Sequence, residues 1–228
     1  MSANDNYQQM KRILYLLLPF ILAAGLTACS ESTEENTEFA NWQERNEIFM
    51  RDTLAHANRV VAAAKAQWGD AWEEHCDWRV YPSFKNTEGG VTTWQDSIAV
   101  RVVEHGTGSG FPLATDSVRV SYAGRLIPSD SYPTGYIFDH TGIGTKIEDI
   151  MDSRYEVTAM MHAGSVIEGW TTALLRMRIG DYWRVFIPAN MAYGSTATTS
   201  GIPASSTLIF DIRLKAFYRV GSIPPPWK

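Results

Sequence analysis

The chain has 228 residues, of which 45% are hydrophobic, 12% aromatic and 20% charged. This composition is typical of a folded globular protein and excludes a disordered or fibrous chain. The net charge is −5 and no stretch is rich in Lys and Arg, so nucleic acid is not an expected partner.

Residues 1–28 are predicted to be a signal peptide. Lys11 and Arg12 precede an apolar run that is too short to favour a membrane-spanning helix. The run ends in Leu26-Thr27-Ala28-Cys29, which resembles the bacterial lipobox, where the cysteine is acylated and becomes the mature N-terminus. We therefore predict lipidation of Cys29. The alternative is a plain secretory signal that leaves a cysteine nearby.

Residues 29–38 are polar and acidic, and they predict a solvated tether that holds a folded domain off a membrane. Because Ser30 and not Asp follows the cysteine, we expect a lipid anchor in the outer membrane of a bacterial cell envelope, on its periplasmic or surface face. The other cysteine, Cys76, lies beside His75. One such pair is weak evidence for a metal or thiol site, so a buried small side chain is the favoured interpretation.

Residues 39–80 are predicted to be helical, as one long helix or two shorter ones that end near Gly69. The apolar residues that recur near helical spacing are Trp42, Phe49, Ala57, Val60, Ala64 and Trp68. Two interpretations of this segment stay open. It is an arm that forms a homodimer or cradles substrate, or it packs on its own C-terminal domain. Residues 81–95, with Pro82, Gly89 and Gly90, are expected to be a connector.

Residues 96–220 are predicted to form an α+β domain with an antiparallel sheet around one short helix, and 221–228 a tail. The helix is expected over Gly169 to Met177. The segments rich in β-branched and aromatic residues are 98–103, 117–122, 183–187 and 207–214.

Several motifs in this domain, taken in order, resemble those of FKBP-type peptidyl-prolyl cis-trans isomerases. The matching segments are Val120-Ser121-Tyr122-Ala123-Gly124-Arg125-Leu126, Phe138-Asp139, Val166-Ile167-Glu168-Gly169-Trp170, Ala192-Tyr193-Gly194 and Ile202-Pro203 through Phe210-Asp211. Each alone is weak, but their common order over about half of the chain is specific. The resemblance implies an FKBP-like sheet wrapped around the short helix, and substrates that are proline-containing polypeptides.

The chemistry of such an enzyme needs no nucleophile, metal or cofactor. Rotation about an X–Pro bond is slow because resonance gives the C–N bond double-bond character. A water-poor apolar site binds the twisted amide better than the planar one. We therefore expect neither a metal nor a cofactor in this protein.

The resemblance also implies a role for each site residue. Trp170 would be the floor on which the proline ring packs, with Tyr122, Phe138 and Phe210 as walls. Val166 and Ile167 would form the rim, and the Ile167 N–H would hold a substrate carbonyl. Asp139 would supply a polar group and Tyr193 a hydroxyl at the mouth. The residues implied in further contact with substrate are Val157 and Ile202.

One wall of the expected site departs from the family pattern. The family's first wall aromatic falls on Val157, although Tyr155 could replace it if the strand is shifted by two residues. Ala204 stands where a second proline is frequent. We therefore expect weaker catalysis with peptide binding kept. The alternative function is a non-catalytic peptide-binding or chaperone module that uses the same site.

Overall fold

Helix α2 (Trp42–Trp68) follows a short 3-10 helix, η1 (Thr37–Phe39), in a computed structural model that describes residues 37–86, 92–198 and 201–226. At about 1.5 Å per residue, this helix is roughly 40 Å long. It ends where predicted, because Gly69 has a φ of 53° and its N–H caps the Lys65 carbonyl. The buried residues lie three, four or seven apart, as one stripe: Trp42, Asn46, Met50, Leu54, Ala57 and Ala64.

The segment after α2 corrects the sequence prediction. The 3-10 helix η2 (Gly69–His75) folds back, and strand β1 (Trp78–Pro82) then pairs antiparallel with β2 (Ser97–Glu104). The prediction of helix over 78–80 and of a connector at 81–82 is therefore wrong. Trp78, Val80 and Tyr81 are residue types that favour an extended strand, and Pro82 is tolerated because it lies at the strand's end.

The sheet contains seven strands, and its main order is β1-β2-β6-β7-β3-β4 with every pair antiparallel. Strand β3 pairs with β7 on one side, and with β5 and then β4 along the other. These strands are β3 (Ser117–Arg125), β4 (Ile137–His140), β5 (Ala159–His162), β6 (Tyr182–Ile187) and β7 (Leu208–Tyr218). The remaining helices are α3 (Ile147–Ile150), α4 (Glu168–Leu174), η3 (Trp94–Asp96), η4 (Ser153–Tyr155) and η5 (Ala189–Met191).

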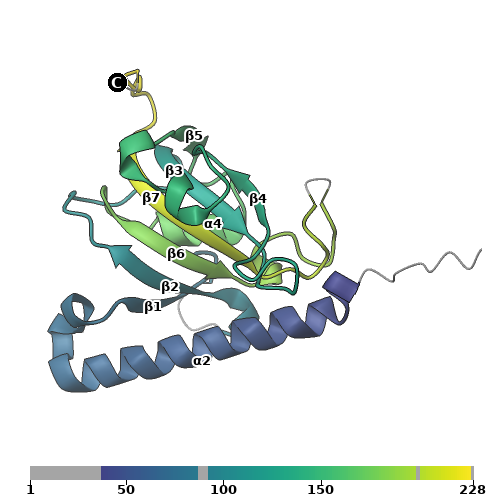
Figure 1. Ribbon diagram of the computed structural model, residues 1–228. Helices are drawn as coiled ribbons and strands as arrows, with labels where there is room; N and C mark the ends of the chain where they lie inside the picture. Colours follow the sequence, from purple (N-terminus) through teal and green to yellow (C-terminus); the bar gives the residue numbers. More distant parts are fainter. Residues whose placement is uncertain (1–36, 87–91, 199–200, 227–228) are drawn as a thin grey trace, which may run out of the picture. The chain divides into compact units, whose positions relative to one another are not determined.

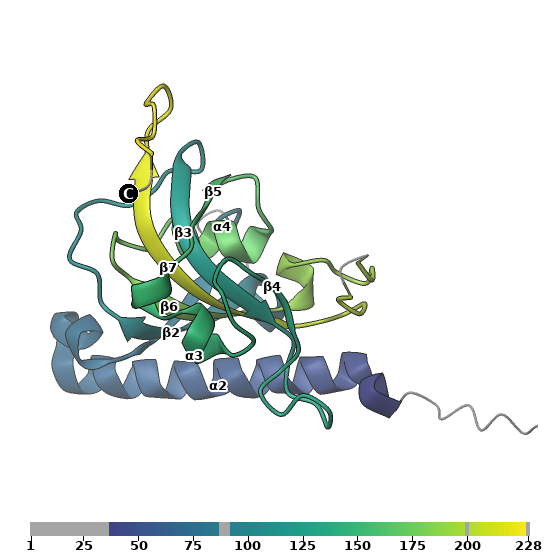
Figure 2. The same ribbon diagram turned by 45° about the horizontal axis from the view of Figure 1, so that its top comes forward.

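Alternation along the strands gives the sheet two buried faces. Residues such as Val100, Val185 and Ile212 pack with Leu174 of α4 in the main hydrophobic cluster. Their neighbours point the other way, so Ala99, Phe186 and Ile209 pack with Met50, Leu54 and Ala57 of α2. Figure 1 shows α2 running along the sheet, and Figure 2 shows the same arrangement tilted forward.

The α2 side of the sheet also buries an ionic group beside β3. The Asp211 carboxylate has no exposed surface and lies 3.2 Å from Arg125 Nη1 and 2.9 Å from Arg184 Nη2. The Tyr182 hydroxyl donates to the same carboxylate at 3.0 Å. A buried carboxylate needs such partners, because an unpaired charge would be strongly destabilising.

Helix α2 therefore packs on the domain of its own chain, which is the second of the two interpretations of this segment. A homodimer through α2 stays a prediction.

Among the described residues no helix combines the length and apolarity needed to cross a membrane. The signal peptide, Cys29 and almost all of the tether lie outside the described residues.

Candidate active site

Trp170 lies in the first turn of α4, facing the sheet, with 3% of its surface exposed. Gly169 allows this position, because a Cβ there would collide with the side chain of Ile187 on β6. Glycine thus brings the helix close to the strand and turns the indole inward. The Trp170 Nε1–H is buried and has no acceptor among the described residues. The family resemblance makes Trp170 the floor of the site, and this role stays a prediction.

Two of the rings predicted as walls contact Trp170 and the third contacts one of these two, and we call the four residues the aromatic cluster. Tyr122 and Phe210 each meet Trp170 edge to face at 5.1 Å, with interplanar angles of 90° and 86°. Phe138 meets Phe210 at 5.5 Å and 84°. These perpendicular arrangements match the quadrupoles of aromatic rings. The structure therefore brings Tyr122, Phe138, Trp170 and Phe210 into one cluster.

Gly124 on β3 is what allows the two phenylalanine rings to meet. A Cβ at this position would collide with the Phe210 ring and lie 2.8 Å from two carbons of the Phe138 ring. The sequence identified Gly124 only as part of a motif. The structure shows why glycine is needed here. The two rings approach the strand so closely that a side chain at this position would not fit.

The polar group of the site is a hydrogen bond between Tyr122 and Asp139. The Tyr122 hydroxyl donates to Asp139 Oδ2 at 2.8 Å. Burial, followed by this hydrogen bond and the charge of Asp139, raises the pKa of Tyr122 well above its usual value, so the phenol stays protonated at neutral pH. Asp139 itself is exposed, so it lies at the edge of the cluster and not within an apolar interior. Tyr193 is 44% exposed.

The predicted rim residues Val166 and Ile167 immediately precede α4, are partly buried and pack against the main cluster. The Ile167 carbonyl accepts the N–H groups of Trp170 and Thr171. Its own N–H donates to no acceptor in the described part of the chain. Ile202 is 2% exposed within the same core, and its contact with substrate stays a prediction.

Val157 is not part of the aromatic cluster. It lies between η4 and β5 and is 41% exposed, and none of the ring contacts of the cluster involves this segment. Tyr155, the alternative residue, is 66% exposed and contacts Arg154. The role of Val157 in binding substrate stays a prediction.

Two residues of α2 make hydrogen bonds to the loop that precedes β7, and the sequence did not indicate these contacts. The indole N–H of Trp42 donates to Ser206 Oγ at 2.8 Å. Asn46 Oδ1 accepts the backbone N–H of Thr207 at 2.8 Å. The helical stripe predicted that Trp42 is buried, but no sequence signal could indicate which loop it would contact.

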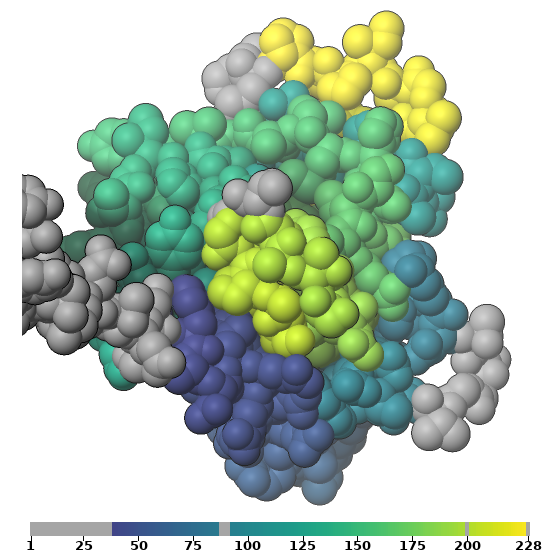
Figure 3. All heavy atoms as spheres, turned by 90° about the vertical axis from the view of Figure 1, so that its right-hand side faces the viewer, coloured from purple at the N-terminus to yellow at the C-terminus, as the bar shows by residue number. Residues whose placement is uncertain are grey.

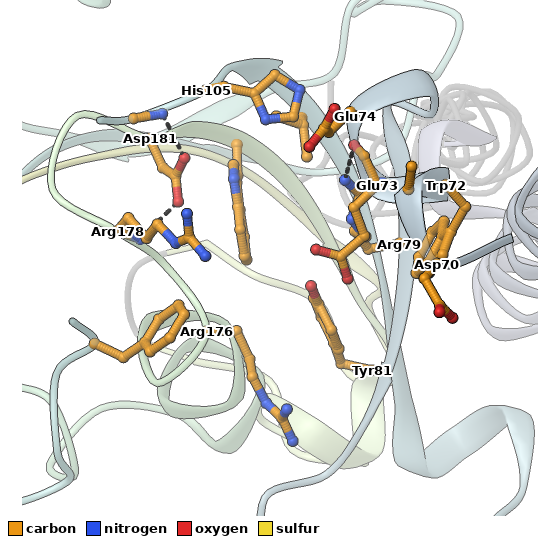
Figure 4. A pocket seen from close by; sticks show the side chains of 15 residues that line it. Asp70, Trp72, Glu73, Glu74, Arg79, Tyr81, His105, Arg176, Arg178 and Asp181 are labelled. Carbon is orange, nitrogen blue, oxygen red and sulfur yellow. Dashed lines mark hydrogen bonds between the residues drawn. The ribbon is translucent and has the colours of Figure 1, made fainter. Parts of the chain in front are cut away.

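A separate cleft of about 710 Å³ lies where η2, β1 and the turn after α4 meet, and we call it the charged cleft. Its floor includes Tyr81 and Trp183, whose rings stack at 6.0 Å. Figure 4 shows Arg176 and Arg178 on one side and Glu73 and Glu74 on the other. Burial, and then the charge of Glu73, raise the pKa of Tyr81.

Other residues of the charged cleft have structural roles. Asp181 accepts the backbone N–H groups of Gly106 and Arg178, both at 2.7 Å or less. Arg79 donates to the Glu73 and Cys76 carbonyls and thereby ties η2 to β1.

The neighbouring residues His75 and Cys76 make separate contacts. His75 stacks on Trp68 at 3.9 Å, whereas the buried Cys76 thiol donates to the Trp78 carbonyl. Within the described ranges, no cluster of three or more potential metal ligands occurs.

Comparison with known proteins agrees with this geometry. Residues 108–215 match the family model of FKBP-type peptidyl-prolyl cis-trans isomerases. The outer membrane protein MIP of Legionella longbeachae is 30% identical over 167 residues, which cover 72% of this chain and 64% of that protein. The FKBP-type 22 kDa peptidyl-prolyl cis-trans isomerase of Escherichia coli is 34% identical over 125 residues, 55% of this chain and 52% of that protein.

A solved peptidyl-prolyl cis-trans isomerase from Pseudomonas syringae pv. tomato is 28% identical, with a TM-score of 0.42, and covers 75% of this chain and 96% of that chain. The alignments with the two curated relatives span 52% and 64% of their length. The family match contains every residue of the aromatic cluster. Residues 108–215 therefore form a domain of the FKBP-type peptidyl-prolyl cis-trans isomerase family.

Proposed function

We propose that this protein is a peptidyl-prolyl cis-trans isomerase that acts on proline-containing polypeptides. The observation that carries the proposal is the aromatic cluster, in which two perpendicular rings pack on the buried Trp170. A pyrrolidine ring is apolar and flat enough to pack on an indole, and the rings around it exclude water.

The aromatic cluster suits the reaction because the barrier to rotation, about 18–20 kcal/mol, comes from amide resonance. Water stabilises the polar planar amide. In an apolar environment this stabilisation is lost, so the free energy of the twisted form relative to the planar form is lower than in water. The Ile167 N–H is positioned at the rim to hold a substrate carbonyl, since no group of the described chain uses it. The Tyr122 hydroxyl is engaged by Asp139 and fixes the ring that forms one wall.

The activity is tested by NMR exchange on an Ala-Pro peptide with catalytic amounts of the full chain. We expect cis-trans exchange faster than the uncatalysed process, which takes tens to hundreds of seconds. An uncatalysed rate together with measurable peptide binding would establish the alternative, a non-catalytic binding module. The non-aromatic, exposed Val157 is the feature that favours a reduced turnover.

We further propose that the protein is held at a bacterial cell envelope by a lipid on Cys29. The support is the Leu26-Thr27-Ala28-Cys29 motif and the similarity to a relative named as an outer membrane protein. Folding of exported proteins is the corresponding role. Mass spectrometry of the membrane fraction is expected to find acylated Cys29, and an unmodified chain in the soluble fraction would contradict the anchor.

A further inference from the structure

We propose that the first two turns of α2 position the loop segments at residues 192–198 and 201–207, so that Trp42 and Asn46 are positioning residues of the isomerase site. The inference rests on the proposed function and deepens it. It assigns a role in the site to a helix that lies outside the family match at residues 108–215.

Asn46 is the central residue of this contact. It is 1% exposed, and its side-chain amide makes hydrogen bonds in both directions. Asn46 Nδ2 donates to the Trp42 carbonyl at 2.7 Å, while Oδ1 accepts the Thr207 N–H at 2.8 Å. The Thr207 hydroxyl also donates to the Asn46 carbonyl at 3.2 Å. A buried asparagine with satisfied partners fixes one register between helix and loop, because sliding would leave polar groups unpaired.

Trp42 adds a second connection at the adjacent loop residue. Its Nε1–H donates to Ser206 Oγ, and the Ser206 hydroxyl in turn donates to the Pro203 carbonyl at 2.6 Å. The Trp42 ring is 6% exposed and belongs to the same hydrophobic cluster as Trp170 and Ile202. The helix is thus linked to the loop through polar groups and through the core that supports the site.

The loop has a conformation that needs external support. Ser205 has a φ of 61°, a region that residues other than glycine rarely occupy. Such a residue persists when the surrounding structure holds it. Its N–H donates to the Gly194 carbonyl at 2.8 Å, which closes the loop beside Tyr193. The contacts with α2 lie at the two residues that follow Ser205.

The loop connects these contacts to the site. It carries Tyr193 and Ile202, and it leads directly into β7, where Phe210 forms a wall. Figure 3 shows the start of α2, in purple and blue, directly against this yellow-green loop. A shift of the loop would therefore move the mouth of the site and one of its walls together.

The test compares Asn46→Ala with Leu54→Ala in the full chain. Leu54 is buried on the same helix, but it packs with sheet residues such as Ala99 and Phe186 in a separate cluster. We expect Asn46→Ala to lower kcat/KM for an Ala-Pro peptide about tenfold. The loss should appear mainly in KM, because loop contacts act on bound substrate as well as on the transition state. Leu54→Ala should stay within about twofold of wild type while it is folded.

A second variant and a second readout separate positioning from folding. Trp42→Phe keeps an aromatic ring and removes the N–H donor, so we expect a rise in KM of about threefold. Hydrogen exchange of the backbone amides at 201–208 should become faster in Asn46→Ala and remain unchanged in Leu54→Ala. Unchanged exchange and kinetics in Asn46→Ala, or equal changes in both variants, would overturn the inference. An inactive wild-type protein with the expected exchange pattern would instead refute the proposed function alone.

Discussion

The aromatic cluster and the charged cleft lie next to the two ends of the same short helix and contrast in chemistry. Trp170 lies in the first turn of α4, whereas Arg176 and Arg178 follow its last residue, Leu174. Each site has a buried tryptophan, Trp170 or Trp183, whose indole N–H finds no acceptor in the described part of the chain. The aromatic cluster surrounds its indole with rings, whereas the charged cleft surrounds its indole with ions and a tyrosine.

This contrast shows that a buried tryptophan is not sufficient for the proposed chemistry. An amide in the charged cleft would keep polar neighbours that stabilise its planar, resonant form. In the aromatic cluster it would lose most of that stabilisation, so rotation would become easier. The surroundings of the indole, and not the indole alone, therefore define the candidate site. Substitutions confined to one of the two sites can therefore break or sharpen this contrast.

The largest effect is expected for Gly124→Ala. The added Cβ would collide with the Phe210 ring and crowd Phe138, so the walls of the aromatic cluster must shift. We expect kcat/KM to fall roughly tenfold to a hundredfold, because overpacking strains the site and displaces groups that contact substrate. Kinetics on an Ala-Pro peptide test this, with circular dichroism to confirm the fold. A folded variant with wild-type kinetics would show that these rings do not form the site.

A smaller effect is expected for Tyr122→Phe. The substitution keeps the ring against Trp170 and removes the hydrogen bond to Asp139. We expect kcat/KM to fall about fivefold, since one hydrogen bond to a carboxylate is lost. Tyr136→Phe is the matched control, because Tyr136 is exposed and pairs with Tyr132 outside the cluster. Equal losses in the two variants would contradict the role of the Tyr122 hydroxyl.

The effect of pH on stability should reveal the raised pKa of Tyr122. A phenol whose pKa is higher in the folded protein than in the unfolded chain keeps its proton longer when folded. Its contribution to stability is therefore complete below about pH 10 and is lost as pH rises above that value. Chemical denaturation at a series of pH values should show a shallower alkaline decline in Tyr122→Phe than in wild type. Identical declines would mean that the Tyr122 pKa is not raised.

The smallest effect is expected in the charged cleft. The double variant Arg176→Ala, Arg178→Ala removes guanidinium groups that lie over the Tyr81 and Phe111 rings, at 5.4 Å in each case. Because neither arginine contacts the aromatic cluster, kcat/KM should stay within about twofold of wild type. A tenfold loss in the same peptide assay would show that the charged cleft takes part in isomerisation, and the contrast between the two sites would fail.

Local patterns allowed much of the site to be predicted from the sequence. Runs rich in β-branched and aromatic residues identified β2, β3, β6 and β7, and a short helix was expected from Gly169 onward. The family resemblance supplied the walls, whose rings lie in one cluster with Trp170. These features depend on residues close in sequence or on motifs whose order is specific, so a single sequence contains the necessary information.

The features that were missed depend on packing between distant segments. Strand β1 was assigned partly to the helical segment, because its five residues are too few to establish an alternating pattern. The bonds of Trp42 and Asn46 join residues that are 164 and 161 positions away in the sequence. The charged cleft likewise combines η2 with the turn after α4. No periodicity in one sequence can specify such pairings.

The most direct test of the aromatic cluster compares Trp170→Leu with Trp183→Leu in the full chain. The two tryptophans are 3% and 4% exposed, so both substitutions remove a similarly buried indole. NMR exchange on an Ala-Pro peptide measures the isomerisation rate, with both variants checked for folding. We predict that Trp170→Leu lowers kcat/KM at least tenfold, and that Trp183→Leu stays within about threefold of wild type. Wild-type exchange in a folded Trp170→Leu variant would contradict the assignment of this cluster as the isomerase site.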